Sequence, residues 1–435
     1  MGAVDRGADA SDRTLATTLK GEQTAGNSQD LRPGAVMVLE QRSAIRRPRG
    51  AIFALGLAVA LTGCAAPQID APFGGLESLT AAGASSSAPD DPARLFIIHG
   101  ITKQDNDYAD ALVQGLASRL GLPEIKWDDR PYAVRGAIAF DDAVADINLR
   151  TYHLSDGRRE RLRVSALNWS PLTESIKQHQ FASDDRISRA LINADIKVDV
   201  INDGLSDAVL YEGKYGTVMR RGVMIGLCAF LDGAFVNDSC APGVASRAEV
   251  ALISESLGSY MLFDAIEALN AGRRDSPAGR PLFMRLRQFY MFANQLPLLE
   301  LADLSARLGA PHSAQREAGT AKLDAFLERL REAHATMRPA ARSAAPGAVS
   351  GAPAPPPLQI VAFTDPNDLL SYEISRANLA ENGAAPTTYS ASNVLYPVAI
   401  SYFGVFANPL TAHTGYSSNP EVLDLVICGA SGCAK

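Results

Sequence analysis

Several residue types on which particular protein classes depend are scarce in this chain. It has 6 His, 5 Cys and 2 Trp among 435 residues. No Cys-x-x-Cys spacing and no nearby histidine accompanies the cysteines, so the usual zinc motifs are missing. The 41 Lys and Arg are outnumbered by 48 Asp and Glu, and beyond residue 63 they form no basic cluster. We therefore expect no metal, no cofactor and no nucleic-acid partner.

The one conspicuous apolar run, at residues 51–60, is too short to span a bilayer, which requires about 20 residues. Three arginines precede it, and Leu-Thr-Gly-Cys at 61–64 follows it. A basic start, a short apolar run and small residues are typical of a secretory signal. The ending resembles a bacterial lipoprotein signal, in which Cys64 becomes the acylated N-terminus. By the same resemblance, Ala65 favours an outer-membrane location in the cell envelope, with the membrane as a partner through the lipid.

The chain divides into three parts on composition. Residues 1–63 read as an N-terminal extension plus the signal, and translation starts at Met37 or the leader is disordered. Residues 64–92 are rich in Ala, Gly, Ser and Pro, which predicts a flexible tether. Residues 93–435 then form one large domain.

Four cysteines remain if Cys64 is lipidated: Cys228, Cys240, Cys428 and Cys433. An even number in an exported chain indicates disulfides. Of the three connectivities, we favour the local one, Cys228–Cys240 and Cys428–Cys433. Four buried free thiols are the alternative.

Ser256 is the most informative residue of the chain. The apolar run at 250–253 ends in Ser254-Glu-Ser-Leu-Gly258, and a helical pattern follows. Strand, sharp turn, serine and helix are the layout of a nucleophile elbow. Small residues are needed two before and two after the serine, because the strand and helix backbones nearly touch there. Gly258 meets this need, and Ser254 stands where glycine is usual.

This segment resembles the elbow of the α/β-hydrolase superfamily, in which an acid and then a histidine follow the serine. The acid of that family lies just after a strand such as 358–363. Asp368 and Asp365 compete for the role, and we favour Asp368. His413 occupies a polar, glycine-containing loop near the C-terminus. The resemblance thus implies a Ser256–Asp368–His413 triad.

A second strand, 95–98, ends in His99-Gly100. In the family, this dipeptide leaves the next backbone N–H free to bind the substrate oxygen. The resemblance implies an oxyanion hole formed by the amides of Ile101 and Leu257. His99 and Gly100 would line the pocket. Trp169, Asn294 and Gln295 follow other strands at the same expected edge, as pocket or turn residues.

Further strands are predicted at 163–167, 288–292, 359–363 and 395–402, and helices at 108–120 and 323–335. This alternation predicts an α/β class: an α/β-hydrolase fold with a mostly parallel central sheet, flanking helices and helical cap-like insertions. Residues 169–248 form either a cap, with a helix at 211–229, or structural padding. Residues 340–357 are an Ala/Pro-rich loop.

The function expected from the resemblance is a membrane-anchored serine hydrolase. It would cleave a carboxylic ester of a small molecule or lipid through an acyl-enzyme. An acyltransferase with the same triad is one alternative. A non-catalytic surface lipoprotein that keeps the fold for binding is the other, because fold alone does not imply activity.

Overall fold

The computed structural model describes residues 66–85, 91–301, 321–335, 356–375 and 388–433. Short gaps interrupt these ranges at 141, 143, 185–186, 191–192, 195, 242–247, 272–278 and 403–405. The predicted signal, Cys64 and nearly all of the 340–357 loop lie outside the described residues.

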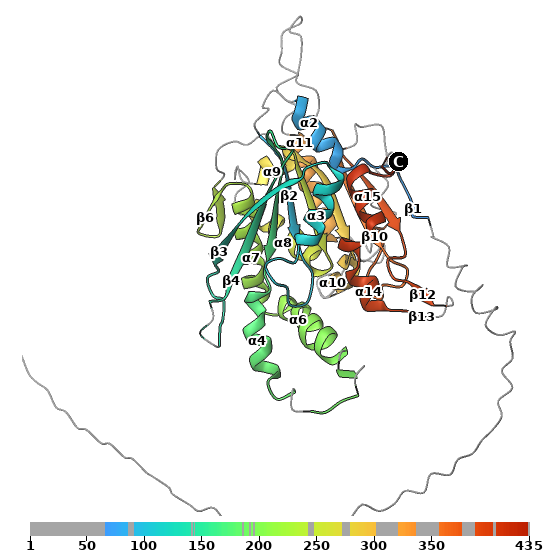
Figure 1. Cartoon of the computed structure of the whole chain (residues 1–435). Helices are drawn as coiled ribbons and strands as arrows, with labels where there is room; N and C mark the ends of the chain where they lie inside the picture. The colour runs from blue at the N-terminus through green and yellow to red at the C-terminus, as the bar shows by residue number, and fades with distance from the viewer. Residues whose placement is uncertain are drawn as a thin grey trace, which may run out of the picture. The chain divides into compact units, whose positions relative to one another are not determined.

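A nine-stranded sheet runs through the centre of the domain in the order β1-β11-β10-β9-β8-β2-β5-β4-β3 (Figure 1). The strands are β1 (Gln68–Ile69), β2 (Ala93–Ile98), β3 (Glu124–Ala133), β4 (Asp146–Ser155), β5 (Glu160–Asn168), β8 (Val250–Glu255), β9 (Leu286–Phe292), β10 (Leu358–Thr364) and β11 (Tyr389–Leu395). Neighbours from β11 to β5 pair in parallel, whereas β1, β4 and β3 pair antiparallel. The predicted mostly parallel sheet is confirmed.

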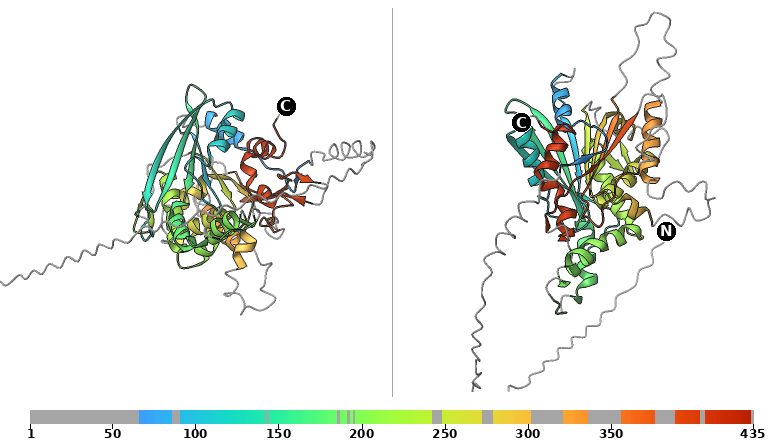
Figure 2. Two further views of the ribbon diagram at one scale, coloured as in Figure 1. Left: turned by 60° about the horizontal axis from the view of Figure 1, so that its bottom comes forward. Right: turned by 90° about the vertical axis from the view of Figure 1, so that its right-hand side faces the viewer.

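Helices cover both faces of the sheet (Figure 2). The helices α2 (Leu76–Ser85), α3 (Asp110–Arg119) and α15 (Pro420–Cys428) contribute to one core, and α7 (Gly216–Phe230), α8 (Leu257–Ala271) and α11 (Ala321–Ala335) to the other. In β2, Leu95 and Ile97 face the first core, and Phe96 and Ile98 face the second. Side chains alternate along a strand, so a continuous apolar run is needed where both faces are buried. The predicted flanking helices are therefore confirmed too.

Smaller elements complete the domain. They are α4 (Pro171–Phe181), the π-helix η2 (Ile196–Leu205), α6 (Ser206–Glu212), α9 (Gly279–Arg285), α10 (Leu296–Leu299), α14 (Pro409–Thr414), the 3₁₀ helix η5 (Tyr416–Ser418), and the hairpins β6 (Ala234–Val236)–β7 (Ser239–Ala241) and β12 (Ser401–Tyr402)–β13 (Phe406–Ala407). No helix among the described residues is both long and apolar enough to cross a membrane.

The structure differs from the expected tether at 64–92. Gln68 and Ile69 pair with β11, and α2 follows them. Phe73, Leu76 and Leu79 are buried in the core that α2 shares with α3 and α15. Because small residues dominate the composition of this stretch, its few apolar side chains, which pack on the domain, gave no clear sequence signal. Residues 66–85 are thus part of the domain rather than a spacer.

The edges of the sheet also depart from the sequence prediction. The strand expected at 395–402 is wrong: β11 ends at Leu395, two residues before Pro397. Its pattern was hidden because Asn393 is buried and polar, with its side chain bonded to the backbone of Ile374. The β3–β4 hairpin was missed because β3 is largely exposed, with Trp127 at 59% relative exposure.

The 169–248 segment has two structurally different parts. Its helix α7 packs on the sheet through Met219, Val223 and Leu227, so this part is not a cap. By contrast, α4, η2 and α6 extend beyond the lower end of the sheet (Figure 1). These three helices lie where a cap was predicted.

Both predicted disulfides are present. Cys228 in α7 bonds Cys240 in β7, and Cys428 at the end of α15 bonds Cys433. The sulfur atoms are 2.01 Å apart in each pair. The local connectivity favoured from the sequence is confirmed.

The order of the strands creates a crevice beside β2. From β2 the chain passes through the β3–β4 hairpin to β5 on one side, and then to β8 on the other side. Loops that leave the carboxyl ends of β2 and β8 therefore diverge. In open α/β sheets, ligands bind at such a reversal of direction. The His99–Gly100 and Ser256 segments both begin at this point.

Candidate active site

Ser256 lies on a sharp turn between the end of β8 and the start of α8. Its φ of 54° is in the left-handed region, which non-glycine residues rarely adopt. The Ser256 N–H donates to Phe292 O at 2.9 Å and so ties the turn to β9. Backbone strain of this kind is found where a fold holds a functional side chain in place. The helix dipole of α8 also points its positive end at the hydroxyl.

The residues two before and two after Ser256 explain how the turn is accommodated. A Cβ atom at Gly258 would lie 2.4 Å from His99 O, so only glycine fits there. Ser254 instead uses its hydroxyl: its Oγ lies 2.8 Å from Ser259 Oγ, and both residues are buried. Serine at 254 therefore links the strand to the first turn of α8. The departure from the usual glycine is compatible with an intact elbow.

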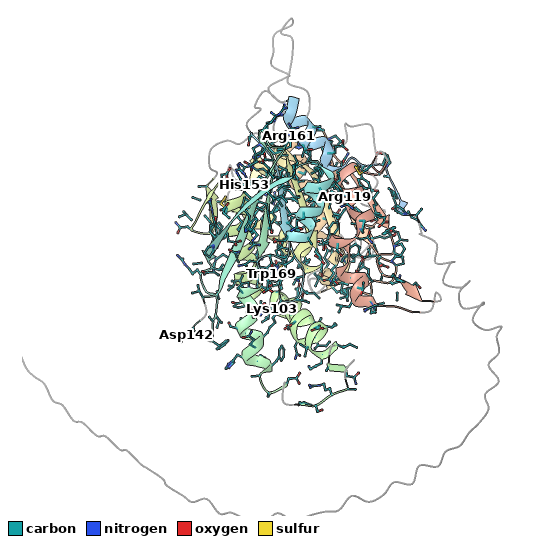
Figure 3. All side chains as sticks on the ribbon, viewed as in Figure 1. Lys103, Arg119, Asp142, His153, Arg161 and Trp169 are labelled. Atoms are coloured by element: carbon teal, nitrogen blue, oxygen red, sulfur yellow. A yellow bond between two sulfur atoms is a disulfide. The ribbon has the colours of Figure 1, made fainter. Side chains whose placement is uncertain are left out.

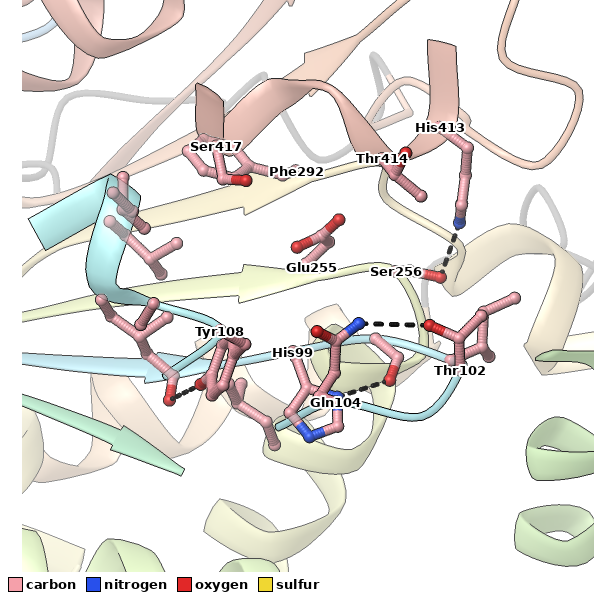
Figure 4. Close-up of a pocket in the computed structure, with 17 residues that line it drawn as sticks. His99, Thr102, Gln104, Tyr108, Glu255, Ser256, Phe292, His413, Thr414 and Ser417 are labelled. Carbon is pink, nitrogen blue, oxygen red and sulfur yellow. Dashed lines mark hydrogen bonds between the residues drawn. The ribbon is translucent and has the colours of Figure 1, made fainter. Parts of the chain in front are cut away.

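His413, in α14, connects Ser256 to an acid. Its Nε2 lies 3.0 Å from Ser256 Oγ (Figure 4). Its Nδ1 lies 2.9 Å from Asp368 Oδ1 and 3.0 Å from Oδ2. A carboxylate can only accept, so Nδ1 carries the hydrogen and Nε2 is left to accept from the serine hydroxyl. All three side chains are buried, at 1% (Ser256), 5% (His413) and 6% (Asp368) relative exposure.

The two aspartates of the acid loop have different surroundings. Asp368 also accepts hydrogen bonds from Tyr416 Oη at 3.2 Å and from a backbone N–H in its own loop. Asp365 accepts from the backbone N–H groups of Val398 and Ala399, at 2.6 and 2.8 Å, through Oδ2. The geometry thus gives Asp368 the contact with His413, and Asp365 anchors the loop after β11.

The candidate oxyanion donors lie on either side of Ser256. Leu257 is the first residue of α8, and the first N–H groups of a helix have no partner within it. No hydrogen bond among the described residues uses the N–H of Ile101. A Cβ atom at Gly100 would lie 2.5 Å from Ser256 Cβ, so the chain passes directly against Ser256.

The stacked side chains of His99 and Trp169 hold the backbone at His99 and Gly100. Their rings stack with centroids 4.8 Å apart and 10° between planes, and Trp169 Nε1 donates to His99 O at 3.1 Å. The Trp169 backbone N–H approaches His99 Nε2 at 3.2 Å, while His99 Nδ1 lies 2.9 Å from Gly100 O. Burial lowers the pKa of His99 to about 4, so the ring is neutral and donates through Nδ1. Trp169 and Lys103 lie at the lower end of the sheet, away from Arg161 (Figure 3).

The insertion reaches the same loop through Asp207. Thr102 has a φ of 85°, and its N–H donates to Asp207 Oδ2 at 3.1 Å. Asp207, on α6, is fully buried and also contacts Lys177 Nζ at 3.0 Å and Thr173 Oγ1 at 2.8 Å. Burial raises the pKa of Asp207, and the nearby Lys177 charge opposes that rise. A buried ion pair on α4 and α6 therefore fixes the backbone next to Ile101.

A cavity of about 230 Å³ opens at Ser256 and His413, and its lining includes the predicted His99 and Gly100. The other three predicted pocket residues are not in its lining. Trp169 is buried behind the strand. Asn294 Nδ2 donates to Tyr372 O at 3.0 Å, which fixes the acid loop. Gln295 Nε2 lies 3.4 Å from His413 Nε2.

Three residues that sequence reasoning missed contribute to the site: Glu255, Tyr416 and Asp207. Glu255 directly precedes the serine, and its position in the elbow was a signal that could have been used. Tyr416 and Asp207 reach the site only through the fold, so the sequence carries no local signal for them. Among the described residues, no group of His, Cys, Asp and Glu side chains could hold a metal ion.

Glu255 has a pKa well above that of an ordinary glutamate carboxyl. Burial raises the pKa of its carboxyl from 4.5 to about 7, with the His413 charge opposing the rise and Asp368 adding to it. The folded protein therefore holds this proton more tightly than the unfolded chain does. Stability contributed by the protonated form is present below pH 4.5 and is lost as pH rises through 7.

We expect Glu255→Gln, which cannot ionise, to be more stable than the wild type at pH 8 by about 3 kcal/mol. At pH 4.5 this advantage should vanish. Urea unfolding of both proteins at the two pH values measures it, with the exposed Glu267→Gln on α8 as the control for loss of a carboxylate. An advantage of equal size at both pH values would contradict the assignment.

No protein-family model and no curated protein matches the chain. Among solved structures, acetyl xylan esterase 1 from Thermoanaerobacterium sp. JW/SL YS485 matches with a TM-score of 0.22 and 11% sequence identity. The match covers 68% of this chain and 89% of that chain. A likeness this low says nothing about the function of this chain.

Proposed function

We propose that this protein is a serine hydrolase that cleaves carboxylic esters. The observation that carries the proposal is the hydrogen-bonded series Asp368–His413–Ser256, which ends at the cavity beside β2 and β8. A nucleophile, a base within hydrogen-bonding reach and a group that orients the base are the signature of an activated serine. The strained turn at Ser256 adds support, because such strain collects at functional sites.

In this mechanism, His413 Nε2 takes the proton of Ser256 as Oγ attacks the ester carbonyl carbon. Asp368 keeps Nδ1 protonated and stabilises the imidazolium that forms. The amides of Ile101 and Leu257 bind the oxyanion. His413 then gives its proton to the leaving alcohol, and water attacks the acyl-enzyme by the same steps. The buried ion pair of Asp207 and Lys177 holds the oxyanion segment in position.

The envelope location stays a prediction supported by the sequence alone. The signal-like run and Leu-Thr-Gly-Cys pattern favour a lipid anchor at Cys64 and a membrane as partner. The lipoprotein signal and the triad are independent features, so the catalytic proposal does not depend on the anchor.

Treatment with a fluorophosphonate probe tests the activated serine directly. We expect covalent labelling of the wild-type protein, because the probe reacts with a serine whose proton a neighbouring base accepts. Labelling should disappear in Ser256→Ala and persist in Ser259→Ala, which changes a nearby buried hydroxyl outside the triad. If the folded wild-type protein is not labelled, the hydrolase proposal fails.

A further inference from the structure

The cavity at Ser256 contains a carboxylate that the triad does not use. Glu255 is the last residue of β8 and is only partly buried. Its side chain points into the cavity, between Tyr108 on one side and Phe292 and Ser417 on the other (Figure 4). No hydrogen bond or ion pair to Glu255 is formed within the described part of the chain. Its oxygens are therefore available to a ligand.

The groups that face Glu255 do not neutralise it. No Lys or Arg is among the residues that line the cavity. The Tyr108 hydroxyl is already engaged, since it donates to Ile97 O at 3.2 Å and Leu167 O at 3.1 Å. The ionisable groups that act on Glu255 are His413, which favours its charged form, and Asp368, which disfavours it. A polar group withdrawn from water without a partner is costly, so a bound substrate that shields this carboxyl should supply one.

A hydroxyl group suits this position better than a cation. A carboxyl with a pKa of about 7 is present in both forms near neutral pH. A hydroxyl can donate to the carboxylate and can also accept from the carboxylic acid. A fixed positive charge would instead oppose the imidazolium that forms on His413 in the same cavity.

The size of the cavity restricts the substrate as well. Its volume of about 230 Å³ is below the range of about 300–1,000 Å³ that is typical of ligand pockets. Gln104 and Ser417 add further polar side chains to its wall. A small, hydroxylated group fits this space and chemistry better than a long acyl chain.

We propose that Glu255 is a specificity residue that selects esters bearing a hydroxyl group near the reacting carbonyl. This inference rests on the proposed hydrolase function and names its substrate class. The hydroxyl can belong to the acyl part or to the alcohol part of the ester. Glu255 receives its hydrogen bond beside the carbonyl that Ser256 attacks.

The test uses two matched pairs of esters with the full-length protein in its disulfide-bonded form. In the acyl pair, p-nitrophenyl 2-hydroxypropionate is compared with p-nitrophenyl propionate. In the alcohol pair, glyceryl monoacetate is compared with propyl acetate. Wild type should prefer the hydroxylated member of at least one pair by about 10-fold or more in kcat/KM. The pair that shows the preference identifies which side of the ester Glu255 contacts.

Three variants separate a specificity role from a structural one. Glu255→Met keeps the length of the side chain but cannot hydrogen-bond strongly. The ratio of kcat/KM for the hydroxylated ester to kcat/KM for the plain ester should therefore fall close to 1. Glu255→Gln retains an acceptor and should show a ratio between those of Glu255→Met and wild type. Glu249→Gln, near the opposite end of β8 and paired with Arg287 at 2.9 Å, is the matched control and should keep the full preference.

The outcomes distinguish this inference from the function beneath it. If wild type hydrolyses the esters without any hydroxyl preference, or if Glu255→Met keeps the preference, the specificity role is wrong and the hydrolase stands. If wild type hydrolyses none of the four esters, the specificity role is wrong; if the fluorophosphonate probe also fails to label Ser256, the hydrolase proposal fails with it.

Discussion

Asp368→Asn should lower kcat about 10⁴-fold, and Asp365→Asn should leave kcat within about tenfold of wild type. The first change reverses the hydrogen bond to His413: the new amide donates to Nδ1 and pushes the hydrogen onto Nε2. An Nε2 that carries a hydrogen cannot accept the proton of Ser256, although the two atoms stay 3.0 Å apart. Steady-state kinetics on a short p-nitrophenyl ester measures the loss.

Asp365→Asn should act on stability instead. Its Oδ2 accepts from the backbone N–H groups of Val398 and Ala399, and its Oδ1 accepts from the backbone N–H of Asn367. An amide can satisfy at most part of this arrangement, and a buried unsatisfied donor costs about 1–3 kcal/mol. We expect a lower melting temperature for Asp365→Asn and a nearly unchanged one for Asp368→Asn. If Asp365→Asn reduces kcat more than Asp368→Asn does, the assignment of the acid is wrong.

The contrast between the two aspartates shows where sequence reasoning stops. Both follow β10 within four positions, and both are buried. What separates them is the position of residues far along the chain: His413 for one, and Val398 and Ala399 for the other. Sequence order could favour Asp368 by its likeness to a family pattern. The contact itself depends on how the C-terminal segment folds back.

The central strands were predictable for a physical reason. Strands β2, β5, β8, β9 and β10 have neighbours on both sides and helices on both faces, so long runs of their residues are apolar. The edges lack that constraint. Exposed β3 is largely polar, and β11 buries Ser392 and Asn393 through hydrogen bonds that an apolar pattern cannot reveal.

The candidate site shows the same division. Ser256, His413 and the His99–Gly100 turn come from local patterns in chain order, which a sequence carries. The proposed roles of Glu255 and Asp207 depend on a carboxylate in a cavity that has no partner among the described residues, and on a buried ion pair from the insertion. The sequence neighbours of Glu255 and Asp207 indicate neither the cavity nor the ion pair. The sequence therefore predicted the candidate triad, whose residues the fold brings together, better than it predicted the groups that surround and position them.

Gly100→Ala should reduce kcat/KM by at least 10²–10³-fold, about the effect of losing one oxyanion donor. The added methyl would lie 2.5 Å from Ser256 Cβ and 3.1 Å from its Oγ. Neither side can yield easily. Ser256 is fixed by its left-handed backbone and its N–H bond to Phe292 O, and the loop after Gly100 is held by Asp207 through Thr102. The resulting shift must displace the Ile101 amide, the nucleophile, or both.

Ester hydrolysis and fluorophosphonate labelling together show whether the Ile101 amide or Ser256 is displaced. If only the Ile101 amide is displaced, the ester reaction should slow while His413 still activates Ser256 for slower but complete labelling by the fluorophosphonate. If Ser256 itself is displaced from His413, labelling should be lost along with hydrolysis. Gly74→Ala is the matched control, because its methyl would meet nothing closer than Gln359 Oε1 at 3.4 Å, an ordinary contact. A Gly100→Ala protein with wild-type kinetics would show that the crowding at Ser256 relaxes without cost, and the oxyanion role of Ile101 would then lose its main support.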